Sequence, residues 1–293
     1  MRLRGLAGAM QQAPSRLSGK EMADFPILED AWLCLEDDRI HSFGSMAELD
    51  REFMDSCDEW VDLFGRWILP AFVDSHTHIV FGKTREKEFI DRIHGLSYEE
   101  IAKRGGGILN SADVLRDASE EQLFFSALHR MEEILSLGTA AIEIKSGYGL
   151  STDSELKMLR VIRALKEVSP VEIRATFLGA HAIPREFHDK REEYIRIITD
   201  EMLPQIAEEK LADFIDVFCD RGFFTQQETE RILEAGARYG LRPKIHANEL
   251  DFTGGIQAGV KYGALSVDHL ECTGDEEIRV LKDSDTMPTL LPS

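Results

Sequence analysis

Several features are scarce or absent in this chain, and each absence argues against a class of protein. The 293 residues contain only four cysteines, widely spaced and without a C-x-x-C pair: Cys34, Cys57, Cys219 and Cys272. We therefore expect neither a disulfide framework nor a structural zinc finger, and we expect a reduced, cytoplasmic setting. No uninterrupted apolar run approaches the roughly 20 residues of a membrane-spanning helix. The segment 1–22 has no apolar core typical of a secretory signal.

Positively charged residues are also in deficit. The chain has 34 Lys and Arg against 54 Asp and Glu, a formal net charge of −20. This balance argues against binding through a nucleic-acid backbone or an anionic membrane surface, so we expect a small-molecule partner instead. With 43% hydrophobic and 30% charged residues, the composition is that of an ordinary globular protein.

The N-terminal part of the chain has the pattern of a small β module. Residues 31–35 and 40–44 are short apolar stretches on either side of a polar turn, which predicts a hairpin. Residues 60–70 indicate a second hairpin that leads into the main domain. We therefore predict two domains: an N-terminal tail with a partial β domain over 1–67, and a larger domain over 68–293.

From Ile68 onward the pattern alternates between strands and helices, which is typical of a parallel α/β fold. Amphipathic helices are expected over 120–137, 153–168, 191–210, 226–239, 253–262 and 275–282. Seven strands are expected to end near His78, Ser146, His181, Asp220, Glu249, His269 and Pro292. These units predict a (β/α)8 TIM-type barrel with seven strands present and the eighth missing. An open doubly wound sheet is the alternative, although no dinucleotide-binding glycine fingerprint follows the first strand.

The length of the larger domain bears on its completeness. A closed barrel of this type needs about 250 residues, and fewer than that follow Ile68. We therefore expect a C-terminally truncated form of a longer enzyme. Apolar surface along the seventh strand is then expected to be exposed, which would favour aggregation.

Two histidines close the first predicted barrel strand. The apolar run that starts at Ile68 predicts a buried strand of a parallel barrel, and it leads into Asp74-Ser75-His76-Thr77-His78. In a β-strand, residues two apart point to the same face, so His76 and His78 can direct two imidazoles at one point. This arrangement predicts half of a metal site. The alternative is a pair of edge histidines that cap the strand through hydrogen bonds.

Further polar groups recur where other predicted strands end, which is where barrel enzymes place their active sites. They are His181, His246, Glu249, Asp268 and His269. Three neutral imidazoles with one further ligand leave a coordination position for water. A divalent metal lowers the pKa of that water from 15.7 to about 7, so the pattern predicts metal-assisted hydrolysis. Glu249 is the candidate that carries a proton to the leaving nitrogen. Its alternative is a solvated loop carboxylate.

Longer motifs connect the chain to a known family. They are Asp74-Ser75-His76-Thr77-His78, Gly82-x-x-Arg85-x-x-Glu88-Phe89, Gly105-Gly106-Gly107-Ile108, Lys145-Ser146-Gly147-Tyr148-Gly149-Leu150, Phe177-Leu178-Gly179-Ala180-His181-Ala182, Lys244-Ile245-His246-Ala247-Asn248-Glu249 and Leu290-Leu291-Pro292. The His-x-His element is general to amidohydrolases, whereas the Lys-Ser-Gly-Tyr-Gly and Gly-Gly-Gly-Ile elements are far more specific. From about Ile27 to the C-terminus, the chain resembles the imidazolonepropionases, a family of the amidohydrolase superfamily that acts in histidine breakdown.

The resemblance implies a reaction and a metal. The reaction is the hydrolytic opening of the cyclic amide of 4-imidazolone-5-propanoate to N-formimidoyl-L-glutamate. By the family's pattern, His76, His78 and His246 bind one zinc or iron ion, divalent or trivalent. Glu249 would handle the attacking water and the proton transfer, and His269 would help to position that water.

The same resemblance implies four substrate contacts besides Glu249: Arg85, Tyr148, His181 and, more weakly, Tyr98. A propionate carboxylate suits Arg85, because a guanidinium can offer it two parallel charge-assisted donors. The alternative for Arg85 is a surface ion pair with Glu86 or Glu88.

The chain also departs from the family pattern. An aspartate at the end of the eighth strand, which completes the family's metal site, would lie beyond Ser293, so full metal affinity is not expected here. Lys145 belongs to the second predicted strand, whereas some amidohydrolases bridge two metals with a carboxylated lysine from the fourth. A single-metal site is therefore expected.

Two alternatives stay open: another mononuclear amidohydrolase or deaminase of a different heterocycle, and an inactive metal-binding fragment. The expected partner is an acidic imidazolone, and a homodimer is plausible for the family.

Overall fold

The structure is a computed structural model that describes residues 2–7, 17, 19–23, 27–96, 100 and 106–291. The chain divides into two compact units, Met1–Ala71 and Phe72–Ser293, and each is described by itself. Within the described ranges, no helix combines the length and the apolar character needed to cross a membrane.

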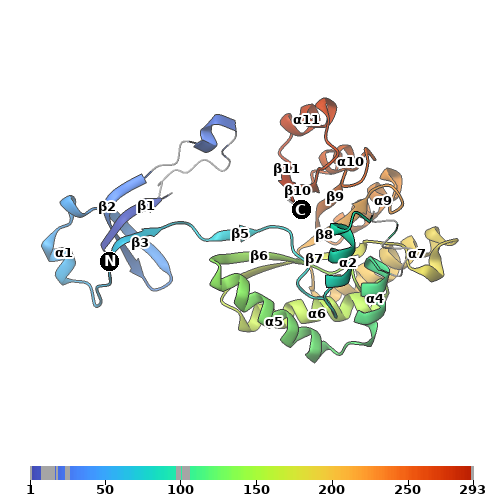
Figure 1. Cartoon of the computed structure of the whole chain (residues 1–293), viewed down its shortest axis with the longest axis horizontal. Coiled ribbons are helices and arrows are strands. Elements are labelled where there is room, and N and C mark those ends of the chain that lie inside the picture. Colours follow the sequence, from blue (N-terminus) through green and yellow to red (C-terminus); the bar gives the residue numbers. More distant parts are fainter. Residues whose placement is uncertain are drawn as a thin grey trace. The chain divides into compact units, whose positions relative to one another are not determined.

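The first unit contains a four-stranded sheet in the order β3-β2-β1-β4. Figure 1 labels β1, β2 and β3. Its strands are β1 (Arg2–Ala7), β2 (Ile27–Glu36), β3 (Arg39–Ser45) and β4 (Asp62–Ile68). Short helices complete it: η1 (Gly19–Ala23), η2 (Met46–Glu48) and α1 (Arg51–Asp55). β2 and β3 are antiparallel across a tight turn, so the hairpin predicted over 31–44 is confirmed. Ala31 and Leu33 form its small buried core.

The second predicted hairpin, over 60–70, is wrong. This segment forms one strand, β4, which pairs in parallel with β1. The pairing register shifts between Leu63 and Trp67, and Gly65 has a φ of 81° there. The glycine therefore accommodates an irregularity inside a strand and not a chain reversal.

The second unit is built on a curled parallel sheet of seven strands, in the order β11-β10-β9-β8-β7-β6-β5. The strands are β5 (Phe72–Asp74), β6 (Thr139–Lys145), β7 (Glu172–Ala180), β8 (Phe214–Cys219), β9 (Arg242–Ala247), β10 (Ser266–His269) and β11 (Met287–Leu290). Every strand lies beside its neighbours in the sequence, as in a barrel, so the predicted fold class is confirmed. A doubly wound sheet would reverse its strand order, and that alternative is wrong.

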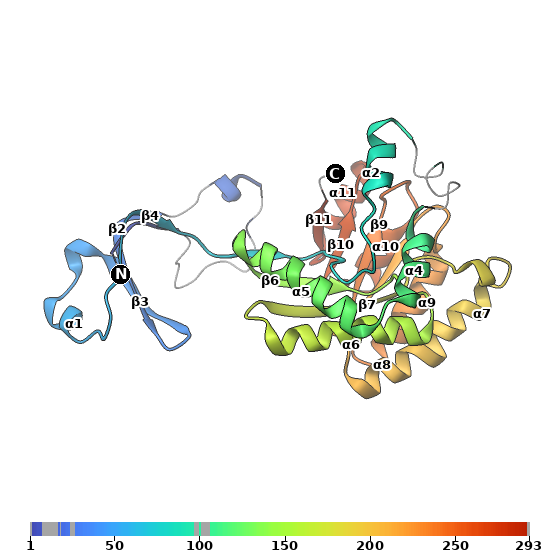
Figure 2. The same ribbon diagram turned by 60° about the horizontal axis from the view of Figure 1, so that its bottom comes forward.

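Helices connect these strands, and several of them cover the outer face of the sheet (Figure 2). They are α2 (Glu86–Ile93), α4 (Ile108–Asp117), α5 (Glu120–Ser136), α6 (Thr152–Val168), η3 (Arg185–Phe187), α7 (Arg191–Arg196), η4 (Ile197–Met202), α8 (Leu203–Glu209), α9 (Gln226–Ala237), α10 (Gly255–Lys261) and α11 (Asp275–Lys282). The helix predicted over 191–210 contains a π-helical stretch at η4. α6 packs on β7, α9 on β8, and α10 on β9. The unit's hydrophobic core lies between these two layers.

The two edge strands differ from the five between them. Phe72 and Val73 of β5 are 66% and 71% exposed, so the expectation of a buried first strand is wrong. β5 pairs only with β6 in the described part of the chain, and its side chains lack neighbours on the other side. Leu290 of β11 is 72% exposed for the same reason, which confirms the apolar exposure predicted for the seventh strand.

The core between sheet and helices gives a test of stability. Leu159 on α6 is fully buried, whereas Leu137 at the end of α5 is 72% exposed. Leu159→Ala should lower the free energy of unfolding by about 2–5 kcal/mol, because it leaves a cavity in the core. Leu137→Ala should change it by less than about 0.5 kcal/mol. Urea unfolding of the two variants, followed by circular dichroism, measures the difference, and equal losses would contradict the packing described.

Candidate active site

The inner face of the parallel sheet carries charged side chains. Glu143 and Lys145 lie two residues apart on β6, Asp216 is on β8, and Lys244 and His246 lie two apart on β9. Alternate residues of a strand face the same side, so each of these strands directs its polar residues inward and its apolar neighbours toward the helices. All five side chains are buried. The barrel interior is therefore an ionic layer rather than a purely apolar core.

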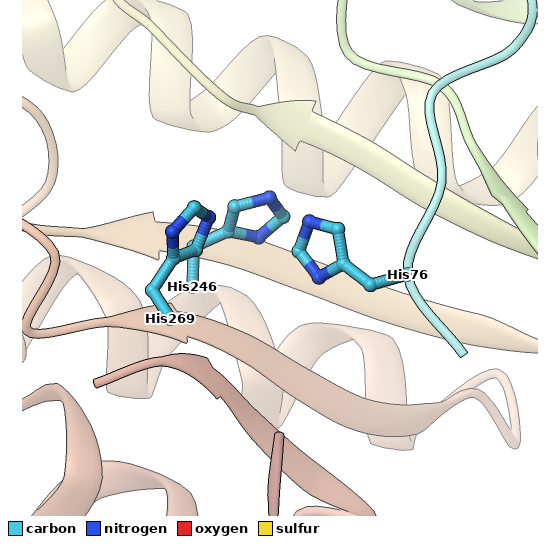
Figure 3. A group of neighbouring side chains, drawn as sticks. All are labelled: His76, His246 and His269. Atoms are coloured by element: carbon cyan, nitrogen blue, oxygen red, sulfur yellow. The ribbon is translucent and has the colours of Figure 1, made fainter. Parts of the chain in front are cut away.

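Three histidines meet at the C-terminal ends of the strands. His76 follows β5, His246 is on β9 and His269 ends β10 (Figure 3). One ring nitrogen from each lies within 4.8 Å of the others, so the three rings are close enough to hold one metal ion. His269 has a φ of 86°, an uncommon backbone conformation that clusters at functional sites.

His78 adjoins this group. Its Nε2 lies 3.4 Å from Nε2 of His246, and its ring centroid is 5.3 Å from that of His76. Neither His76 nor His78 is inside a strand, because β5 ends at Asp74. The segment still runs along β6: the Thr77 carbonyl accepts from the Lys145 N–H at 2.9 Å, and the Thr77 hydroxyl donates to the Glu143 carbonyl at 2.6 Å. These bonds hold both imidazoles at the site.

Carboxylates lie against the far sides of two of these rings. His76 Nδ1 is 2.7 Å from Asp268 Oδ2, and His246 Nδ1 is 2.9 Å from Asp216 Oδ2. Burial, opposed by the carboxylates, lowers the pKa of His76 to about 4 and that of His246 to about 4. Both rings are therefore neutral at pH 7, which is the form that binds metal. With Nδ1 facing a carboxylate, Nε2 is left for a ligand.

Two candidate substrate residues lie on one side of this group. The Tyr148 and His181 rings are 5.3 Å apart, and the His181 ring stacks on His78 with centroids 5.3 Å apart and planes at 13°. His181 Nδ1 donates to the Gly147 carbonyl at 2.9 Å. The loop that carries Tyr148 is fixed by buried Glu155, whose carboxylate accepts from the N–H groups of Gly147, Gly149 and Leu150.

The other candidates lie at the rim. Arg85 precedes α2, with its side chain 37% exposed and 3.5 Å from Glu88, so the surface ion pair weighed above does form. Burial raises the pKa of Tyr148 and the charge of Arg85 opposes this rise, whereas burial lowers the pKa of His181 and Arg85 adds to that fall, so Arg85 lies near both side chains. Glu249 Oε2 lies 3.5 Å from His269 Nδ1, and burial raises the pKa of Glu249. Tyr98 lies outside the described residues.

Lys145 is buried among carboxylates. Its Nζ is 2.8 Å from Glu143, 2.8 Å from Asp216 and 3.5 Å from Asp268. Burial lowers its pKa, but the three carboxylates outweigh burial and raise it. The three carboxylates therefore favour the ammonium form of Lys145, and the lysine lies on the second strand of the sheet, as predicted from the sequence.

The sequence interpretation missed the buried carboxylates Glu143 and Asp216, and also Lys244 and Glu155. The sequence does contain a signal for Glu143, because this residue stands between two isoleucines in a strand that is otherwise buried. A charge at such a position must face a partner, but the partner's identity depends on which strands are neighbours.

Comparison with known proteins gives the class and then the family. No protein-family model matches the chain. Among solved structures, a triazine hydrolase from Arthrobacter aurescens aligns with a TM-score of 0.65 and 15% identity, covering 99% of this chain and 64% of that one. A 5-methylcytosine deaminase from Klebsiella pneumoniae aligns with a TM-score of 0.62 and 17% identity, covering 87% and 61%. At these identities the likeness shows the fold class alone, which this chain shares with the two enzymes.

Curated relatives are much closer in sequence. The imidazolonepropionase of Flavobacterium johnsoniae is 53% identical over 97% of this chain, and that of Christiangramia forsetii is 48% identical over 99%. The chain spans 68% and 70% of the lengths of these two relatives. It belongs to the imidazolonepropionase family.

The buried histidines predict how stability depends on pH. Because their pKa values are lower in the folded chain than in the unfolded chain, protons bind the unfolded state first as the pH falls from about 6.5 to about 4. The free energy of unfolding of the metal-free protein should therefore fall across this range. His246→Asn should reduce that fall by roughly 1–3 kcal/mol.

Urea unfolding at several pH values, with a chelator present, measures this slope. His129→Asn is the matched control, because the His129 side chain is 84% exposed. It should keep the wild-type slope, and an equal change in both variants would contradict the assignment to burial.

Proposed function

We propose that this chain opens the ring of 4-imidazolone-5-propanoate by hydrolysis, giving N-formimidoyl-L-glutamate in histidine degradation. The observation that carries the proposal is the histidine group at the C-terminal ends of the strands, in a chain of the imidazolonepropionase family. Barrel enzymes place their reacting groups at this end of the sheet. The substrate is a small acidic molecule, in keeping with a chain whose charge opposes nucleic acid and membranes.

One zinc or iron ion fits the donors present. His76, His78 and His246 would hold it, because their rings are buried and adjacent and their pKa values are lowered below 6.5. When bound, such a metal supplies Lewis acidity and lowers the pKa of a coordinated water to about 7. Imidazole suits zinc and iron alike.

Glu249 is proposed to move the proton. Its raised pKa favours a carboxyl group that can both accept a proton from water and return it to the leaving nitrogen. His269, 3.5 Å from Glu249, would orient the attacking water. Glu249 lies just past β9 and His269 is the last residue of β10, at the end of the sheet where barrel enzymes bind their substrates.

The substrate's two ends would meet different groups. Tyr148 offers a hydroxyl and His181 an unprotonated Nε2 beside the metal position, which suits the polar imidazolone ring. Arg85 would leave Glu88 and pair with the propionate carboxylate, since a guanidinium binds a carboxylate through two donors. Tyr98 and Glu249 are proposed as further substrate contacts.

The setting of the enzyme is also part of the proposal. All four cysteines carry free thiols, which favours a reduced compartment, and we propose the cytoplasm. A homodimer is the proposed assembly, by analogy with the family.

The proton-transfer role has a direct test. Metal-loaded wild-type chain should consume imidazolone propionate, followed by loss of ultraviolet absorbance, and removal of the metal by a chelator should abolish turnover. Glu249→Gln should lower kcat by about 10²- to 10⁴-fold with the metal content unchanged. Glu271→Gln is the matched control, because Glu271 lies at the same 3.5 Å from His269. If the wild-type chain binds metal but shows no turnover, the proposed hydrolase activity is wrong and the chain is a metal-binding protein.

Substrate identity has a second test. Arg85→Ala should raise KM for the imidazolone by about 10- to 100-fold, because a charge-assisted pair is lost, and should change kcat little. Arg174→Ala, which removes an exposed ion pair with Glu172 near the start of β7, should leave both constants unchanged. Turnover of a neutral heterocycle, insensitive to Arg85→Ala, would favour a deaminase of another substrate.

A further inference from the structure

Five charged side chains lie directly beneath the histidine group and form one connected network. Its members are buried and come from four strands: Glu143 and Lys145 from β6, Asp216 from β8, Lys244 from β9 and Asp268 from β10. Each of them contacts at least two others or a histidine of the site, so the network has no unpaired member.

Lys145 connects the two carboxylates that face histidines. Its Nζ lies 2.8 Å from Oδ2 of Asp216 and 3.5 Å from Oδ2 of Asp268. The same two oxygens lie 2.9 Å from Nδ1 of His246 and 2.7 Å from Nδ1 of His76. One ammonium group therefore stands behind both imidazoles, through one carboxylate each.

Each carboxylate is also held at its second oxygen. Asp216 Oδ1 accepts from the backbone N–H of His246 at 3.1 Å, and Asp268 Oδ1 accepts from the Ser266 hydroxyl at 2.6 Å. A carboxylate fixed at both oxygens cannot rotate, so its imidazole partner has one preferred ring orientation. The hydrogen bond from His76 Nδ1 to Asp268 selects the tautomer of His76 with the proton on Nδ1. The negative charge of Asp216, 2.9 Å from Nδ1 of His246, favours the same tautomer there, and in both rings the Nε2 lone pair is left free.

Lys244 extends the network to the segment that carries His76. Its Nζ donates to the Ser75 carbonyl at 2.8 Å and to Glu143 at 2.6 Å. Glu143 in turn accepts from Lys145 and from the Thr176 hydroxyl. This second lysine therefore anchors a segment whose own strand is paired on one side only.

The charges sum to a net negative layer under the histidines: two ammonium groups face three carboxylates. Burying such groups costs desolvation energy that their pairing barely repays, so a network of this kind is poor evidence for stability alone. Its geometry instead meets what a cation site needs, namely neutral imidazoles with fixed direction above an excess of negative charge.

We propose that Lys145 is a positioning residue for the metal site: by clamping Asp216 and Asp268 together, it fixes the orientation and tautomer of His246 and His76 so that their Nε2 atoms face one ion. Lys244 and Glu143 complete the clamp by tying Ser75 to β6 and β9. The inference rests on the proposed function for the presence of a metal, and it assigns a role to the second-strand lysine and its partners.

The first test measures affinity for the metal alone. Lys145→Met keeps the length of the side chain and removes its charge, and it should weaken zinc binding by about 10- to 100-fold in competition with a chromophoric chelator. Lys166→Met is the control, because Lys166 makes an ion pair with Asp213 whose side chains are about one third exposed. Its affinity for zinc should match the wild type. Cobalt substitution should show an altered visible spectrum in Lys145→Met only.

A second test needs no variant at Lys145, which protects the inference if Lys145→Met fails to fold. Two-bond proton–nitrogen NMR of the metal-free wild type should show His76 and His246 with the proton on Nδ1, assigned by the loss of each signal in His76→Asn and His246→Asn. Asp216→Asn and Asp268→Asn should each disturb the tautomer of the partner histidine alone.

The outcomes separate the inference from the proposed function. Wild-type zinc binding that a folded Lys145→Met retains in full would overturn the positioning role and leave the metal centre intact. Protons on Nε2 of both histidines would do the same. A wild type that binds no zinc would overturn the metal centre and this inference together.

Discussion

The structure depends on one constraint: charges that face the inside of a parallel sheet must satisfy one another, because water does not reach them. Glu143, Lys145, Asp216, Lys244 and Asp268 meet this constraint as a group, and none could be buried alone at acceptable cost. Asp268 and Asp216 of this layer contact His76 and His246 and orient their rings. The chemistry at the end of the sheet is therefore built on the pairing of charges below it, and the hydrophobic core between sheet and helices keeps that layer dry.

The sequence predicts those parts of the fold whose signals are local. The six expected helices and the seven expected strands occur in the predicted order, because each has its own hydrophobic periodicity. The sequence reasoning did not predict α2 and α4, and β5 ends at Asp74, before the predicted end near His78. Pairing between strands that are far apart in the sequence has no local sequence signal of this kind. β4 was mistaken for a hairpin because Gly65 looks the same in a turn and in a bulged strand, and only its distant partner β1 decides between them. The burial of β5 was overestimated for a related reason: it depends on a neighbouring strand on each side.

The candidate site divides in the same way. His76, His78, His246 and His269 could be proposed from spacing and strand ends, and the structure brings them together. The carboxylates behind them could not, because their meaning depends on register: Asp216 lies opposite Lys244, and Asp268 opposite His246. Nor does spacing disclose that Glu155 gathers three backbone N–H groups to shape the loop of Tyr148. What the sequence reveals is the set of reactive groups, and what it hides is how they are held.

The consecutive order of the strands has a consequence for how the protein assembles. Each βα unit contacts the next one along the chain, so most of the sheet can grow through contacts of short sequence separation, which form quickly. The contact between His76 and Asp268 is different, because it joins positions 192 residues apart. Because closing so long a loop costs conformational entropy, we expect this contact to form late in folding. A metal ion would then bind the folded sheet and not its folding intermediates. Binding would therefore raise the free energy of unfolding of the whole unit.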